Sequence, residues 1–141
     1  MALLAAIAAA VTLIAAPTYT VGQVQRSFRA QTRTPLVLEP SASTDAVTTL
    51  VTRPRSTPRF GRFELYVLRP STARATLRAL LGGARRNANG IYWTRDQNAG
   101  WIATTVYGRN LAAGWFPPRG AKRVDARWTR LQTVLRRIPP G

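Results

Sequence analysis

With 141 residues the chain is long enough for one domain, and 21 basic against five acidic residues give it a formal net charge of +16. It contains no cysteine and no histidine, and its five acids are scattered with no close pair. This composition excludes disulfides, thiolate zinc sites and histidine-based catalysis, and it argues against a paired-carboxylate mechanism, so we expect neither an enzyme nor a cofactor.

Residues 1–22 form an apolar, alanine-rich first segment. The continuous apolar run ends before Pro17, which is short for a membrane span of about 20 strongly apolar residues. Three interpretations are open: an organelle-targeting segment, an anchor that crosses a membrane through residues 2–21, and a secretory signal. The absence of any acid before Glu39, with arginine and serine after the apolar run, favours the targeting segment and a mitochondrial location.

Residues 23–60 are predicted to form an extended arm. The segment is rich in threonine, serine and arginine, and four prolines interrupt any long helix. Its apolar stretches at 36–38 and 47–51 are candidates for short strands or docking segments. As a free linker such an arm would be disordered, whereas in a large particle it would lie along a partner.

A basic α+β domain is predicted over residues 61–141. It opens with a strand over 62–68, where apolar and polar residues alternate. A helix follows from about Ser71 to Leu81, where two glycines stop it. This strand–helix unit leads into a basic turn at 85–90.

Three short strands and a helix complete the predicted domain. The strands are expected over 91–94, 101–106 and 111–116, separated by turns. The helix, expected over 122–138, carries an apolar stripe at helical spacing and arginines at its other positions. The stripe consists of Val124, Trp128, Leu131 and Leu135. These elements predict a small three-stranded antiparallel sheet packed on a C-terminal helix.

A spaced sequence pattern runs through these last elements. It consists of Gly90-Ile91-Tyr92-Trp93, Trp101-Ile102-Ala103, Gly108, Phe116 and Ala126-Arg127. The pattern resembles the AP2 DNA-binding domain, and more closely its apicomplexan-type branch, over about residues 89–138. The resemblance implies a sheet whose open face lies on nucleic acid, where arginine and tryptophan side chains read bases. Small units of three strands and a helix also occur as arm-binding domains of integrases.

The two faces of the predicted sheet are expected to differ. The face expected to pack on the helix carries Ile91, Trp93, Trp101, Ala103 and Phe116. The opposite, open face carries Tyr92, Thr94, Ile102 and Thr104. Trp93, Trp101 and Trp128 are therefore interpreted as core residues, whereas Trp115 and Tyr107 fit a core position and an exposed stacking position equally well.

The arginines lie mainly in turns and on the last helix rather than along the three strands, an arrangement that suits phosphate contact better than base reading. A large positive charge with few acids to balance it indicates a polyanionic partner, and arginine binds phosphate through a bidentate fork. A GC-rich genome would explain arginine in place of lysine, and a solvated helix face would explain the arginines of the last helix. Neither explains the shortage of acids. The candidate nucleic-acid-binding residues are Arg85, Arg86, Tyr92, Thr94, Arg95, Arg109, Asn110, Arg119, Lys122, Arg123, Arg127 and Arg130.

We predict a structural protein that binds ribosomal RNA in a mitochondrial ribosome, beside neighbouring ribosomal proteins. The prediction combines an AP2-like pattern that lacks most base-reading arginines, an acid-free N-terminus and long basic extensions. Such a protein would neutralise RNA phosphates and dock by shape. Two alternatives are open: a nuclear, sequence-specific AP2-type DNA-binding regulator, and a single-span membrane subunit of a respiratory complex or virion.

Overall fold

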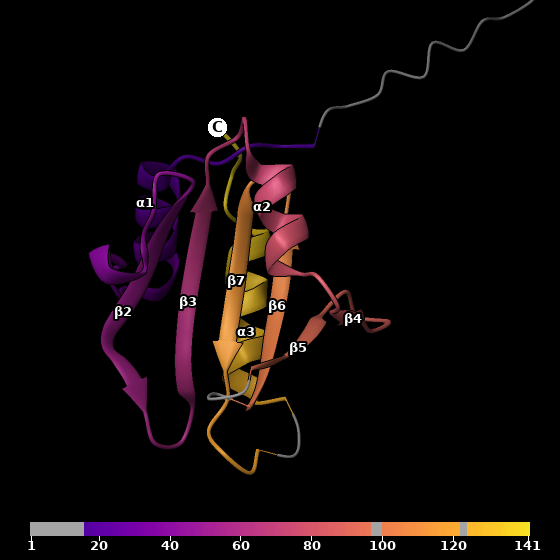
Figure 1. Cartoon of the computed structure of the whole chain (residues 1–141). Helices are drawn as coiled ribbons and strands as arrows, with labels where there is room; N and C mark the ends of the chain where they lie inside the picture. The colour runs from indigo at the N-terminus through magenta and orange to yellow at the C-terminus, as the bar shows by residue number, and fades with distance from the viewer. Residues whose placement is uncertain (1–15, 97–99, 122–123) are drawn as a thin grey trace, which may run out of the picture.

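The computed structural model describes residues 16–96, 100–121 and 124–141, which form an antiparallel sheet with helices on both faces (Figure 1). The strand order across the sheet is β1-β2-β3-β7-β6-β5-β4. The strands are β1 (Val37–Leu38), β2 (Val47–Thr57), β3 (Gly61–Leu68), β4 (Arg85–Arg86), β5 (Tyr92–Asp96), β6 (Gly100–Tyr107) and β7 (Leu111–Phe116). The helices are α1 (Val21–Thr32), α2 (Ala73–Leu80), α3 (Ala126–Arg136) and the short 3-10 helix η1 (Pro40–Ala42).

The α+β class predicted from the sequence is confirmed, but the predicted small three-stranded sheet is wrong. β5, β6 and β7 pair as three consecutive antiparallel strands, and α3 follows them, as expected. However, β7 also pairs with β3 along its whole length, with Ala113 opposite Leu65. This pairing makes the sheet seven strands wide and places β3, the strand of the predicted strand–helix unit, near its centre.

The extended arm predicted over residues 23–60 is also wrong, because its residues form α1 and β2. α1 begins with a capping box between Thr20 and Gln23 and buries Val24 and Phe28 against the sheet. β2 is eleven residues long and pairs with β3. The prolines that argued for an arm do interrupt regular structure, but they fall outside α1 and, within β2, in the stretch where the β2–β3 register shifts.

The main core lies between α1, α3 and one face of the sheet. Trp128 of α3 is fully buried, as the sequence predicted, and stacks on Trp115 of β7 with ring centroids 6.1 Å apart. Phe63 of β3 lies 6.1 Å from Trp128 on one side and 6.3 Å from Phe28 of α1 on the other. Each such buried aromatic ring contributes about 2–3 kcal/mol. This aromatic cluster fixes both helices on the sheet.

The second face of the sheet is partly covered by α2, which lies in front of the strands in Figure 1. Leu77 of α2 packs with Tyr66 and Val106 over a small buried cluster. Tyr92, Thr94, Ile102 and Thr104 share this face as predicted, because Tyr92 pairs with Thr104 and Thr94 with Ile102. The face is not open, however, since Thr104 is only 4% exposed and the other three side chains are partly buried.

Phe116 lies on this second face, and its predicted position against the last helix is wrong. The register places Trp115 opposite both Ala103 and Phe63, so the next residue points to the other side of the sheet. There the Phe116 ring stacks under the Arg62 guanidinium at 4.0 Å.

Asn110, predicted as a nucleic-acid contact, is instead a buried link between distant parts of the chain. Its side-chain oxygen accepts from the backbone N–H of Tyr19, and its amide donates to the carbonyls of Tyr19 and Leu68, at 2.8 to 2.9 Å. The preceding turn fits closely against Pro17, whose carbonyl would collide with any Cβ at Gly108. A fully buried side chain with these bonds is not available to a ligand, so this site assignment is corrected.

Replacing Asn110 by alanine is expected to lower the free energy of unfolding by about 1–3 kcal/mol, because the buried polar groups of Tyr19 and Leu68 lose their partners. Urea unfolding followed by tryptophan fluorescence measures the change. Asn89→Ala, an exposed asparagine in a turn, is the matched control and is expected to stay within about 0.5 kcal/mol of the wild type. Equal stability of the two variants would contradict the linking role.

Candidate nucleic-acid interface

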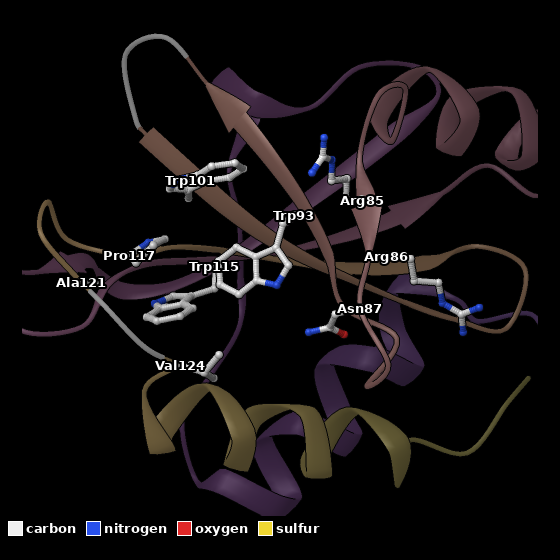
Figure 2. Close-up of a pocket in the computed structure, with 9 residues that line it drawn as sticks. All are labelled: Arg85, Arg86, Asn87, Trp93, Trp101, Trp115, Pro117, Ala121 and Val124. Atoms are coloured by element: carbon white, nitrogen blue, oxygen red, sulfur yellow. The ribbon is translucent and has the colours of Figure 1, made fainter.

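A pocket of about 600 Å³ opens on the helix side of the sheet, beside the start of α3 (Figure 2). This size falls within the roughly 300–1,000 Å³ of small-molecule sites. It is lined by side chains from the sheet, the turn after β4 and the loop after β7: Arg85, Arg86, Asn87, Trp93, Trp101, Trp115, Pro117, Ala121 and Val124. Three of the chain's four tryptophans therefore meet here, next to Arg85. Arg86 also borders the pocket, but its guanidinium faces Tyr92 on the other side of the sheet.

The strand register explains why these residues meet. Arg85 pairs with Trp93, Trp93 with Ala103, and Ala103 with Trp115, so the four form one row across β4, β5, β6 and β7. Paired residues lie on the same face of an antiparallel sheet. Ala103 has only a methyl group, so the two indoles on either side of it stand above it. The row thus runs from an arginine at the sheet edge to a tryptophan in the core.

Trp115 forms a rigid inner wall of the pocket. It is 1% exposed and lies between Trp128, stacked at 6.1 Å, and Phe60, stacked at 5.8 Å. Its indole N–H donates to the Phe60 carbonyl at 2.7 Å. Packing and hydrogen bonding therefore fix the ring before any ligand binds.

Trp101, which the sequence analysis placed in the core, is 54% exposed, so that interpretation is wrong. It lies two residues before Ala103 on β6, nearer the strand end, and Trp128 packs over Phe63 and Trp115 rather than over Trp101. Val124, the first residue of the predicted apolar stripe, is likewise 37% exposed, because α3 begins only at Ala126. Large exposed aromatic rings beside a pocket are typical of binding surfaces.

Several predicted site residues surround this pocket. Arg85 and Arg86 are exposed on β4, and the exposed Arg95 carries its guanidinium 6.0 Å from the Trp101 ring centroid. Arg119 is exposed in the loop after β7 and lines a neighbouring groove with Arg62. Lys122 and Arg123 lie outside the described residues.

The start of α3 brings two more predicted residues near the same loop. Arg127 is exposed, donates to Asp125 at 2.9 to 3.0 Å and places its guanidinium 4.8 Å from the Phe60 ring centroid. Arg130, one turn further along α3, is exposed. Asp125 caps the helix by accepting from the Arg127 backbone N–H at 2.8 Å.

The remaining predicted residues lie elsewhere. Tyr92 and Thr94 are on the second face of the sheet, where the Arg86 guanidinium lies 5.8 Å from the Tyr92 ring. Arg109 is exposed in the turn after β6, at the opposite end of that strand from Trp101, and its backbone N–H donates to Pro17. The predicted set is therefore divided between a group around the tryptophan pocket and scattered positions.

A buried carboxylate organises the arginines on the second face. Glu64 is 4% exposed and binds the Arg55 guanidinium and the Tyr66 hydroxyl, each at 2.6 Å, with Arg62 at 3.1 Å. Burial, followed by the charge of Glu64, raises the pKa of Tyr66 above its ordinary value. Arg55 also lies 3.9 Å from Glu39, which binds Arg53 at 3.1 Å. Glu39 and Glu64 are therefore already paired with arginines of the protein itself.

The chain matches no protein-family model, no curated protein and no solved structure. In the part of the chain that the structure describes, no helix is long and apolar enough to cross a membrane. The apolar segment predicted over residues 1–22 falls mostly on residues 1–15, which lie outside that part.

The cap of α3 is expected to titrate in acid. Hydrogen bonds from the Arg127 side chain and backbone lower the pKa of Asp125 from its ordinary 3.8 to about 2. A lowered carboxyl pKa contributes stability that is complete above the unfolded pKa and is lost as the pH falls through the folded one. Asp125→Asn is therefore expected to lose less stability than the wild type between pH 4 and pH 2, measured by urea unfolding at each pH. Asp45→Asn is the control, because Asp45 is an exposed acid that forms no ion pair among the described residues. If the stability of Asp125→Asn fell with pH as that of the wild type does, the stabilising role of Asp125 would be contradicted.

Proposed function

We propose that this protein is a non-catalytic RNA-binding component of a ribonucleoprotein particle, with a mitochondrial ribosome as its setting. The observation that carries the proposal is a surface of exposed arginines that the protein's own acids do not neutralise. The mechanism is neutralisation of RNA phosphates by arginine together with docking of a rigid sheet and its turns by shape.

The described side chains form few ion pairs with one another. Of the twenty arginines, these pairs involve Arg53, Arg55, Arg62 and Arg127, and their acids are Glu39, Glu64 and Asp125. Most of the other described arginines are exposed and form no ion pair with a described acid. A net charge of +16 on 141 residues repels itself unless a polyanion supplies the opposite charge.

The distribution of these arginines supports a partner that contacts several sides of the protein. α2 carries Arg74 and Arg78 on one face of the sheet, whereas α3 on the other face carries Arg130 and Arg136, all of them exposed. α1 adds the exposed Arg26 and Arg29, and the exposed Arg33 follows it as the C-cap. A protein embedded in folded RNA meets phosphates in this way, whereas a sequence-reading DNA-binding domain presents one recognition surface to a groove.

Of what the AP2 resemblance implies, we keep nucleic-acid binding but not base reading from the sheet. The three strands and the helix that carry the pattern are present, but Tyr92 and Thr94 lie on a face that α2 partly covers. Base reading from that face would need an accessible sheet, so we place the nucleic-acid contacts on the turns, the helices and the pocket side instead. The DNA-binding regulator is therefore the second candidate.

Sedimentation of a lysate that contains the tagged, full-length protein tests the proposal. Co-sedimentation with a ribosomal subunit that disappears after RNase treatment is expected. Carbonate-resistant sedimentation with membranes would favour the membrane subunit instead. Preference for one DNA duplex over its scrambled sequence would favour the regulator.

The arginine contribution is expected to appear in the salt dependence of RNA binding. Each phosphate contact adds about 0.7–0.9 to the slope of log affinity against log salt. Arg130→Ala/Arg136→Ala is therefore expected to reduce the slope for a structured RNA, measured by fluorescence anisotropy at several salt concentrations. Arg53→Ala, whose guanidinium is bound to Glu39, is the matched control and is expected to change the slope less. A slope near zero in the wild-type protein would contradict electrostatic RNA binding.

A further inference from the structure

We infer that the tryptophan pocket is a subsite for a single unpaired nucleotide of RNA, with its base against Trp101 and its phosphate at Arg85. This inference rests on the proposed RNA binding, and it adds a preference for an unpaired base that phosphate neutralisation alone does not require. The site would lie on the helix side of the sheet, beside the start of α3 (Figure 2).

The aromatic surfaces suit a flat ring. Trp101 is 54% exposed, although tryptophan has the largest side chain of the apolar residues. Trp115 on β7 stands across the pocket and is held rigid by its two stacking neighbours. Trp93 on β5 lies in the same row as Trp115, and Trp101 lies on β6, the strand between them. Unpaired bases bind proteins chiefly by stacking on such rings, and stacking tolerates any base because every base has a π face.

The polar groups at the rim suit the rest of a nucleotide. Arg85 pairs with Trp93 at the end of the row, is exposed, and forms no ion pair with an acid whose side chain is described. Asn87 uses its side-chain oxygen within its own turn, accepting from the backbone N–H groups of Asn89 and Ile91 at 3.0 and 2.9 Å. Figure 2 shows its amide nitrogen on the side of Trp93, which leaves a donor for an acceptor atom of the base, such as a ring nitrogen of adenine.

The positive charge around the pocket favours a nucleotide over flat or apolar ligands that carry no phosphate. Among the described residues that line it, the charged ones are Arg85 and Arg86, and Arg85 shares the face of the tryptophans. Arg95 adds a further cation 6.0 Å from the Trp101 ring centroid. A purely apolar peptide segment would gain nothing from these cations, whereas a nucleotide joins an aromatic ring to a phosphate at a short distance. The stacking ring of Trp101 and the bidentate phosphate donor Arg85 together suit a nucleotide of RNA.

Binding of labelled oligoadenylate to the full-length protein tests the inference. Loss of one stacked base corresponds to about a 5- to 150-fold loss of affinity. Trp101→Ala is therefore expected to weaken binding of single-stranded oligoadenylate at least about fivefold, and Trp101→Phe, which keeps a stacking ring, much less. Both variants are expected to bind a fully paired, blunt RNA duplex as the wild type does. Leu80→Ala, another exposed apolar residue but on α2, is the matched control.

The outcomes separate this subsite from the proposed function. If the wild type binds both RNAs and Trp101→Ala binds oligoadenylate as tightly as the wild type, the subsite is wrong while RNA binding stands. If no RNA binds to the wild type, both proposals fail. An oligonucleotide with abasic sites that binds as tightly as oligoadenylate would also overturn the stacking role. A circular dichroism spectrum equal to that of the wild type establishes that each variant is folded.

Discussion

The stacking of Trp128 on Trp115 is the contact on which the rest of this structure depends. It seats α3 over β7 and β3, where Phe63 and Phe28 extend the same aromatic cluster to α1. Because the helix sits there, no described helix covers the half of this face towards β5 and β4 (Figure 1). The tryptophan pocket is the direct result: the same residue, Trp115, is core on one side and pocket wall on the other.

Much of the fold from residue 61 onwards could be predicted from the sequence, including the strand over 62–68 that occurs as β3, whereas the segment before it could not. Alternation and turn residues between 91 and 116 are local signals, and the three strands and the helix after them occur as predicted. The sequence predicts an arm over residues 23–60 because the prolines and threonines of this segment signal breaks. The strand that pairs with β2, β3, follows the segment in the chain. Pairing between strands is a tertiary effect that composition does not encode.

The candidate site could be predicted only in part, for reasons that particular residues make clear. Arg85 and Arg86, which lie on β4, can be predicted because charge is visible in any sequence. Trp101 was misplaced because its exposure depends on where α3 begins and which strands it covers. Phe116 was misplaced although the tight turn that pairs Tyr107 with Leu111 sets the register, and counting from it puts Trp115 opposite Ala103. Asn110 shows that a polar residue in a turn can be buried and can hold distant segments together by hydrogen bonds.

The first and last described segments lie at one end of β6 and β7, and the tryptophan pocket lies at the other end. Gly141 donates its backbone N–H to Thr18, and Pro17 accepts from Arg109, so the first and last described segments meet beside the turn after β6. Trp101 is the second residue of β6 and lies at the opposite end of that strand. A tether at Gly141, to a sensor surface or to a fluorescent reporter, therefore points away from the pocket and leaves it facing solution. The molecule has one end suited to attachment and another suited to recognition.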